Sequence, residues 1–344
     1  MRLTKNLLKA AVAMAICVTF VSCELPLDLD LDFSGYEIFP DGNPTWPDDG
    51  GPTTPPPAYV FVAAAANGDT VVAVGTKFVV WTDDSTWSTT PGPYGEFADV
   101  VWMDTMFVAV GSYMNVACSK DGITWNLNGQ WSAYCLNSAA YSGTQVVVTG
   151  NASAPDYSGP WTKASIFVMN DQGSLDSIGP IDSMPLLTKV LWVDSQFVAF
   201  GGYESIMHKS QAMITSKDGI IWTRHPFSPQ PEHFFTDVIW CGDHYLAAYG
   251  GQIFRSDNGT EWTKVAELNG SVNSLYRHES TYLAVGAEGH ISISSDGIQW
   301  TQVTFPDLTG LYAAIYCGGQ YYAFGWEAVF SSPDGMEWTR CTVR

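Results

Sequence analysis

One short motif recurs along this chain and limits the folds that it can adopt. Its pattern is Ser, any residue, Asp or Asn, Gly, two residues and Trp, as in SSDGIQW at 294–300. Five copies match closely, and two weaker copies, TDDSTW at 82–87 and NDQGSL at 170–175, extend the series. The markers are 38 to 50 residues apart and are Asp83, Asp121, Asp171, Asp218, Asn258, Asp296 and Asp334. A period of this length is the signature of a repeat architecture.

Each repeat unit contains the pattern of four short strands. A first apolar run ends in an aromatic residue, as at Trp102, and a second ends in glycine, as at Gly111. A third run enters the motif, a fourth begins at its tryptophan, and no helical period appears. Seven such units predict an all-β fold, a seven-bladed β-propeller of four-stranded antiparallel blades, rather than an open array, because seven units can close into a ring. The expected blades cover about 58–90, 96–128, 133–178, 187–225, 234–265, 271–303 and 310–343.

The motif has the chemistry of a tight turn. Its aspartate can accept backbone N–H groups, its glycine can adopt positive φ, and its tryptophan can pack against a neighbouring sheet. We therefore expect a structural turn at all seven markers. The motif resembles the Asp-box, or bacterial neuraminidase repeat, of propellers in sialidases, some glycoside hydrolases, sortilin-type receptors and photosystem assembly factors. The resemblance covers 58–344, although the box here is one residue shorter than the usual one. It implies that the motifs lie on the face away from a ligand site.

The N-terminus predicts export. Residues 1–22 have a basic start and an apolar run from Ala10 to Val21, as in a secretory signal peptide. The segment FVSC, which ends at Cys23, resembles a bacterial lipobox, which implies cleavage before Cys23 and its lipidation. Ordinary cleavage nearby, leaving a free Cys23, is the alternative. Residues 23–57 are rich in Pro, Gly and Asp and predict a linker. We therefore expect a bacterial membrane lipoprotein on the periplasmic or cell-surface face.

Composition and spacing exclude several classes of function. The net charge is −20 and no basic stripe occurs, so a nucleic-acid partner is not expected. No cysteine or histidine spacing suggests a metal site, and the sequence predicts no cofactor. A sialidase needs an arginine cluster, yet no arginine occurs in the first three units after the linker. This argues against an active sialidase, whereas paired carboxylates that meet only in space leave a glycoside hydrolase possible.

Variation between the units indicates where a ligand binds. The segments from the second-strand glycine to the motif are longest in units three and four, at 150–171 and 201–218. Because loops that vary on a repeated frame carry function, we place the site at loops 151–165, 202–214 and 226–235. The expected ligand-binding residues are Trp131, Tyr134, Tyr157, Trp161, Tyr203, His208, His233 and Trp326. The alternative for each ring is that it only covers the core.

The function expected from the sequence is binding of a glycan or a protein without catalysis. Aromatic side chains on the variable loops suit both kinds of ligand. One alternative is a glycoside hydrolase or lyase with carboxylates near the propeller axis. The other, suggested by analogy with the photosystem assembly factors, is a scaffold for envelope assembly.

Overall fold

A computed structural model describes most of the chain from Tyr59 onward. The residues that it describes are 59–81, 86–90, 95–128, 132, 134–152, 163–170, 173–181, 186–204, 209–228, 235–303, 305, 307 and 309–344. The expected signal peptide, Cys23 and the linker lie outside these residues, as do Asp83 and Asp171. In the described part, no helix is long and apolar enough to cross a membrane.

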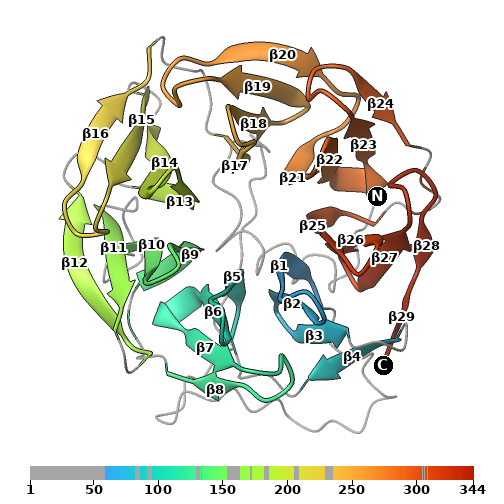
Figure 1. The fold of residues 1–344 in the computed structure, drawn as a ribbon, viewed down its shortest axis with the longest axis horizontal. Coiled ribbons are helices and arrows are strands. Elements are labelled where there is room, and N and C mark those ends of the chain that lie inside the picture. Colours follow the sequence, from blue (N-terminus) through green and yellow to red (C-terminus); the bar gives the residue numbers. More distant parts are fainter. Residues whose placement is uncertain are drawn as a thin grey trace, which may run out of the picture. The chain divides into compact units, whose positions relative to one another are not determined.

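The described residues form seven antiparallel sheets around one axis (Figure 1). Blade 1 contains β1 (Phe61–Ala66), β2 (Val71–Gly75), β3 (Phe78–Trp81) and β4 (Thr86–Thr90). Blade 2 contains β5 (Phe97–Trp102), β6 (Phe107–Gly111), β7 (Val116–Ser119) and β8 (Asn126–Leu127). Blade 3 contains β9 (Tyr134–Tyr141), β10 (Val146–Ala152), β11 (Lys163–Met169) and β12 (Leu175–Ile181). Blade 4 contains β13 (Leu186–Val193), β14 (Gln196–Glu204), β15 (Lys209–Ser216) and β16 (Thr223–Pro226).

The remaining three blades repeat this order. Blade 5 contains β17 (Asp237–Trp240), β18 (Tyr245–Tyr249), β19 (Gln252–Ser256) and β20 (Thr263–Glu267). Blade 6 contains β21 (Val272–His278), β22 (Thr281–Gly286), β23 (Ile291–Ser294) and β24 (Trp300–Gln302). Blade 7 contains β25 (Leu311–Cys317), β26 (Gln320–Gly325), β27 (Ala328–Ser332) and β28 (Thr339–Arg340). Two 3-10 turns, η1 (Ser112–Met114) and η2 (Ala287–Gly289), and the C-terminal strand β29 (Thr342–Val343) complete the described elements. The predicted seven-bladed, all-β fold is confirmed.

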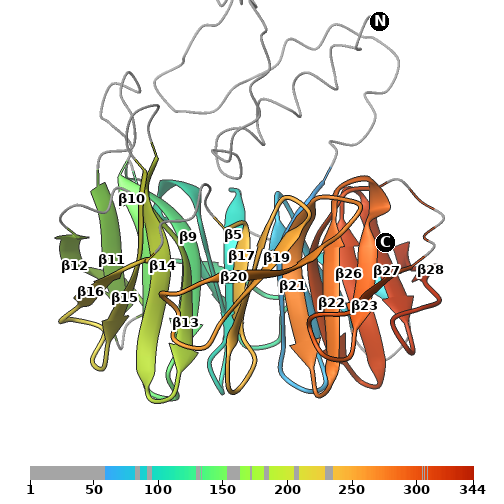
Figure 2. The same ribbon diagram turned by 90° about the horizontal axis from the view of Figure 1, so that it is seen from above.

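The alternation of strands gives the propeller two different faces (Figure 2). The first strand of each blade is innermost and runs from one face to the other, and the next three strands alternate. Turns between second and third strands, such as η1 and η2, share a face with the connections between blades; we call it the variable face. Turns between third and fourth strands, such as those at Gly122 and Gly297, lie on the opposite face, which we call the motif face.

The core consists of apolar layers between neighbouring blades. All five residues of β6 are buried, and Val108 and Val110 pack with Leu136 and Val148 of blade 3. Equivalent clusters join the other blades, so each sheet buries both of its sides only in the presence of its neighbours. Stability therefore depends on completing the ring, as expected for repeats that cannot fold alone.

The glycine that ends most second strands is explained by a β-bulge. In six blades the innermost strand carries one extra residue opposite this glycine, as Ala98 does between Phe97 and Asp99. A Cβ at Gly111 would meet the carbonyl of Glu96, and a Cβ at Gly286 would meet that of Ser271. Only glycine lets the bulged backbone approach so closely.

The motif forms the same hydrogen-bonded turn in each close copy. In blade 6, one carboxylate oxygen of Asp296 accepts from the backbone N–H groups of Ile298 and Gln299 at 2.8 and 2.7 Å. Gly297 has φ +72° and lies so near Leu246 of blade 5 that a Cβ would reach it at 2.8 Å. The Trp300 indole donates to the Gly297 carbonyl at 3.0 Å and packs on the cluster between blades 5 and 6. These contacts are local or between blades, so the turn needs no ligand.

The carboxylate of this turn makes stability depend on pH. The backbone hydrogen bonds from Gln299 and Ile298 hold the pKa of Asp296 below its ordinary value of 3.8. A lowered pKa stabilises the fold above the unfolded value, and the contribution is lost as the pH falls through the folded value. Asn258, the natural variant in blade 5, accepts the equivalent N–H groups at 2.9 Å without a charge. Asp296→Asn should therefore keep the turn and lose less stability than the wild type below about pH 4.

Thermal unfolding between pH 7 and pH 3 measures this difference. Asp296→Ala is the matched control, because it removes the acceptor and should lower the melting temperature over the whole range. Equal acid sensitivity of Asp296→Asn and the wild type would show that the carboxylate does not contribute as described.

Both ends of the described chain close the ring. Strand β29 leaves blade 7 and pairs in parallel with β4 of blade 1, so that Thr342 lies opposite Thr86 and Val343 opposite Trp87. Near the other end, Val60 forms an antiparallel bridge with Trp326 of blade 7. Apolar packing between blades 1 and 7 and the added C-terminal strand thus close the ring together.

Candidate functional site

The bulges place seven equivalent residues around the axis. The residue after each bulge, or at the start of β17 in blade 5, lies at the same position of each innermost strand. Because these strands start at the variable face, the positions lie toward that face. They are Ala63, Asp99, Ser138, Lys189, Asp237, Ser274 and Ala313, and we call them the axial ring. Blades 2 to 6 thus contribute polar or charged side chains, and blades 7 and 1 contribute alanine.

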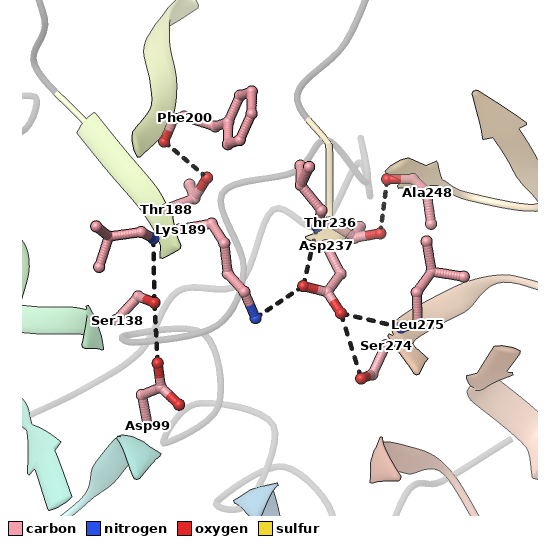
Figure 3. A network of polar contacts seen from close by, with 12 residues as sticks. Asp99, Ser138, Thr188, Lys189, Phe200, Thr236, Asp237, Ala248, Ser274 and Leu275 are labelled. Carbon is pink, nitrogen blue, oxygen red and sulfur yellow. Dashed lines mark hydrogen bonds and ion pairs between the residues drawn. The ribbon is translucent and has the colours of Figure 1, made fainter. Parts of the chain in front are cut away.

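Asp237 binds both neighbouring blades (Figure 3). One carboxylate oxygen accepts from its own following N–H, that of Val238, at 2.9 Å, and from the Lys189 ammonium of blade 4 at 2.9 Å. The other accepts from the Ser274 hydroxyl at 3.3 Å and the Leu275 N–H at 2.9 Å in blade 6. The side chain of Asp237 is only 8% exposed, so this carboxylate is buried with its hydrogen-bonding capacity largely used.

Asp99 of blade 2 makes the equivalent contacts to its own backbone and to the following blade, without a hydrogen-bonded lysine partner among the described residues. Its first oxygen accepts from the Val100 N–H at 2.8 Å, and its second accepts from the Ser138 hydroxyl and the Ala139 N–H of blade 3, both at 2.9 Å. Burial raises the pKa of Asp99 above its ordinary value, against the opposing effects of the Lys189 charge and of these hydrogen bonds. The environment therefore disfavours the free anion at this position.

Lys189 is the cation of the axial ring. Its side chain extends from β13 toward Asp237 and is 29% exposed (Figure 3). Burial opposes its charge, yet Asp237 and then Asp99 raise the pKa of Lys189 above its ordinary value. The ammonium is thus held charged between two carboxylates.

The bulge residues add a second set of contacts between blades. The Asn137 amide donates to the Leu187 carbonyl of blade 4 at 2.8 Å, and the Asn273 amide donates to the Leu311 carbonyl of blade 7 at 2.8 Å. In blade 5, the Thr236 hydroxyl donates to the Val272 carbonyl of blade 6 at 3.0 Å. Side chains of the innermost strands therefore join successive blades at the variable-face end of the axis.

The carboxylate of Asp237 is fully engaged in contacts with its own and neighbouring blades. A glycoside hydrolase needs one carboxyl group free to act as acid and another free to act as base or nucleophile. Each oxygen of Asp237 already accepts two hydrogen bonds from the protein. The described charges are therefore arranged to hold blades together and to present a polar surface.

Two extended hairpins stand beside the axial ring on the variable face. In blade 2 the second strand ends at Gly111, whereas β10 and β11 continue their pairing past Gly150 through Ala152 and Lys163. In blade 4, β14 and β15 continue past Gly201 to the pair Glu204 and Lys209. These are the two units in which the sequence predicted long segments.

The structure describes only part of the expected ligand site. Tyr134 begins β9, is half-buried and meets the Phe167 ring edge-on at 5.5 Å between centroids. Tyr203 lies in the extended part of β14, opposite Ser210. Trp326 is half-buried and forms the bridge with Val60, and its backbone N–H donates to the Gly310 carbonyl. These three residues belong to blades 3, 4 and 7. The other expected ligand residues, which lie outside the described residues, are Trp131, Tyr157, Trp161, His208 and His233.

Sequence reasoning missed the axial ring, although a signal was present. In blades 2, 4 and 5 the ring residue stands three positions before the aromatic residue that ends the first apolar run, as in DVVW for Asp99, KVLW for Lys189 and DVIW for Asp237. A charged residue that recurs at one register of a buried strand marks a position toward the axis. The prediction from sequence used the aromatic residue at the end of this run, such as Trp102, and not the residue at its start.

Comparisons with known proteins show similarity at the level of the fold only. No protein-family model matches the chain, and no curated protein matches its sequence. The solved structure of YCF48 bound to D1 peptide is 16% identical, with a TM-score of 0.56 over 71% of this chain and 80% of that one. The WD40 propeller domain of Doa1 is 12% identical, with a TM-score of 0.58 over 80% of this chain and 92% of that one.

A bacterial structure is also similar. The extracellular domain of the putative one-component system BT4673 from B. thetaiotaomicron is 9% identical, with a TM-score of 0.60 over 83% of this chain and 41% of that one. At such identities, similarity shows the fold alone. The comparisons and the strand topology agree on a β-propeller, here with seven blades of four antiparallel strands.

Proposed function

We propose that this protein is an exported, lipid-anchored propeller that binds a glycan or protein ligand on its variable face without catalysis. The observation that carries the proposal is the pair of extended hairpins, β10–β11 and β14–β15, on adjacent blades of that face. The motif face, in contrast, repeats one turn in blade after blade. A surface that differs between blades on a repeated frame is where selection for a partner acts.

The kinds of protein that share the fold support a binding role. One similar solved structure is a propeller in complex with a peptide, and another is the extracellular domain of a bacterial protein. The propeller fold thus suggests ligand binding or a scaffold role, and the basic start with the FVSC segment supports export. The expected aromatic residues belong to the same region: Trp161 lies in the segment between β10 and β11, and Trp131 precedes β9.

Membrane attachment through Cys23 has a direct test. Cys23→Ala should move the protein from the membrane fraction to the soluble exported fraction, because a lipidated cysteine carries acyl chains whose burial contributes about 0.8 kcal/mol per CH₂. Cell fractionation with labelled fatty acid measures both the position and the lipid. Cys17→Ala, within the apolar run, is the control and should leave the protein membrane-bound. A Cys23→Ala protein that stays in the membrane would exclude this anchor.

Ligand binding is tested with residues 58–344. A glycan array and cross-linking to envelope proteins identify the ligand, and Trp131→Ala and Trp161→Ala should then each weaken binding about 30-fold, because central aromatic residues each contribute about 2 kcal/mol. The matched control is Ile298→Ala with Ile220→Ala, two side chains that are 42% and 54% exposed on the motif face. Equal loss in both pairs, or none in the tryptophan pair, would place the site elsewhere. An envelope protein as the ligand would indicate the scaffold role.

A further inference from the structure

The axial ring repeats with a period of three blades. Asp99 in blade 2 binds Ser138 of blade 3 as Asp237 in blade 5 binds Ser274 of blade 6. In the blade after each aspartate, the bulge residue is asparagine, and both asparagines donate to the next blade at 2.8 Å. Blades 2 and 3 and blades 5 and 6 therefore carry the same polar pattern, and any difference between the two pairs of blades is informative.

The two pairs of blades differ in the blade before the aspartate. Blade 4 supplies Lys189 to Asp237, but blade 1 has Ala63 in the place of that lysine. Both residues follow the bulge at the same register, Lys189 opposite Phe200 and Ala63 opposite Val74. The carboxylate oxygen of Asp237 that binds Lys189 accepts both the Val238 backbone N–H and the Lys189 ammonium.

The equivalent oxygen of Asp99 has one donor fewer. Among the described residues, only the Val100 N–H donates to it, at 2.8 Å. A carboxylate oxygen accepts about two hydrogen bonds, so by equivalence with Asp237 the second acceptor position of this oxygen should face blade 1, where Ala63 has only a methyl group. The Lys189 charge acts on Asp99 from across the ring but makes no hydrogen bond with it.

The Lys189–Asp237 pair indicates which chemical group would fit at Asp99. At Asp237 the second donor is a primary ammonium on a flexible aliphatic side chain, that of Lys189. In blade 1 the equivalent residue, Ala63, has no such side chain. A metal ion is a poorer fit, since no cluster of three metal-ligating side chains occurs in the part of the chain that the structure describes. A half-buried carboxylate gains most from a single charged donor that completes its hydrogen bonds.

We propose that Asp99 binds a lysine ammonium of a protein ligand that reaches the axis from the variable face. The lysine takes at Asp99 the place that Lys189 takes at Asp237, and its stem lies beside Ala63. This inference rests on the proposed function and makes it specific: the ligand is a protein, and one of its lysines enters the axial ring.

A lysine introduced at position 63 tests whether Asp99 can bind an ammonium group on the side of blade 1. Ala63→Lys should place an ammonium on Asp99 and should melt about 2–4 °C above Ala63→Met, which has a stem of similar length without the charge. The difference should disappear when Asp99→Asn is added to both variants. An Ala63→Lys protein that melts at or below the temperature of Ala63→Met would overturn the proposal.

Binding in trans is tested with a minimal probe. Titration with Nα-acetyl-lysine amide, followed by NMR of the backbone amides of Asp99, Val100 and Ala139, should give a saturable shift that Nα-acetyl-norleucine amide does not give. The shift should be lost in Ala63→Lys and weakened by added salt. A shift that is the same with both probes, or that persists in Ala63→Lys, would contradict an ammonium site.

The outcomes separate this inference from the proposed function. If a protein ligand of the variable face is found and Ala63→Lys and Asp99→Asn leave its affinity unchanged, the ammonium site is wrong and the proposed function stands. If the lysine probe binds as expected but the Trp131 and Trp161 variants never affect a ligand, the site stands and the proposed function is wrong.

Discussion

Removal of Cys341–Arg344 should open the propeller and lower its melting temperature by about 10 °C or more. The deletion takes away β29, and with it the hydrogen bonds that join Arg344 to Trp87 and Thr89 of blade 1, each 2.7 Å long. It also uncovers Trp87, whose side chain is fully buried against Tyr322 and Phe324 of blade 7. Hydrogen bonds of about 1 kcal/mol each and the exposed indole sum to about 3–6 kcal/mol.

The control for this deletion keeps the backbone. Arg344→Ala retains the amide and carbonyl that pair with blade 1, so its melting temperature should stay near that of the wild type. Calorimetry of both variants, with the tryptophan fluorescence of the folded protein, measures the effect. A deletion variant as stable as Arg344→Ala would show that packing of blades 1 and 7 alone closes the ring.

Lys189→Met should destabilise the protein by about 1–3 kcal/mol, because it leaves Asp237 buried without its counter-charge. The side chain of Lys189 keeps 29% exposure, so solvent screening reduces the effect below that of a fully buried pair. Asp237→Asn alone should also destabilise, since the amide cannot accept all four hydrogen bonds. The double variant should lose less than the sum of the single variants, as expected when two residues interact directly.

Denaturant unfolding of the four proteins gives the coupling energy between Lys189 and Asp237. Lys264→Met is the matched control, because the Lys264 pair with Glu267 is exposed on both sides and should contribute little. Additive losses at Lys189 and Asp237 would mean that their 2.9 Å contact does not stabilise the ring.

The fold could be predicted because the repeat restates one structural unit seven times. The turn at 294–300 contains nearly all of its own hydrogen bonds, from Ser294 to Trp300, so its residues report local structure without help from the rest of the chain. The same holds for the strand pattern on either side. Local information of this kind, repeated at a period of about 40 residues, is sufficient to indicate a propeller.

The closure and the axial ring could not be predicted in the same way. Strand β29 is two residues long and has no pattern of its own, and it forms only because the ring brings blade 7 beside blade 1. Asp99 and Ser138, or Lys189 and Asp237, come from different blades and meet only once the innermost strands surround one axis. Such pairs depend on contacts between units, and a period does not specify which side chains face each other.

The sequence by itself therefore determined the repeated unit: four strands, a glycine where the innermost strand bulges, and a turn held by Asp296 and its equivalents. It also indicated blades 3 and 4 as the place where the units differ. Only the tertiary structure decided how the ring closes and where its buried charges lie. The physical reason is that turns and strands are stabilised by neighbours in the chain, whereas Lys189, Asp237 and Asp99 are stabilised across blades, by partners that the closed ring brings within hydrogen-bonding distance or Coulombic range.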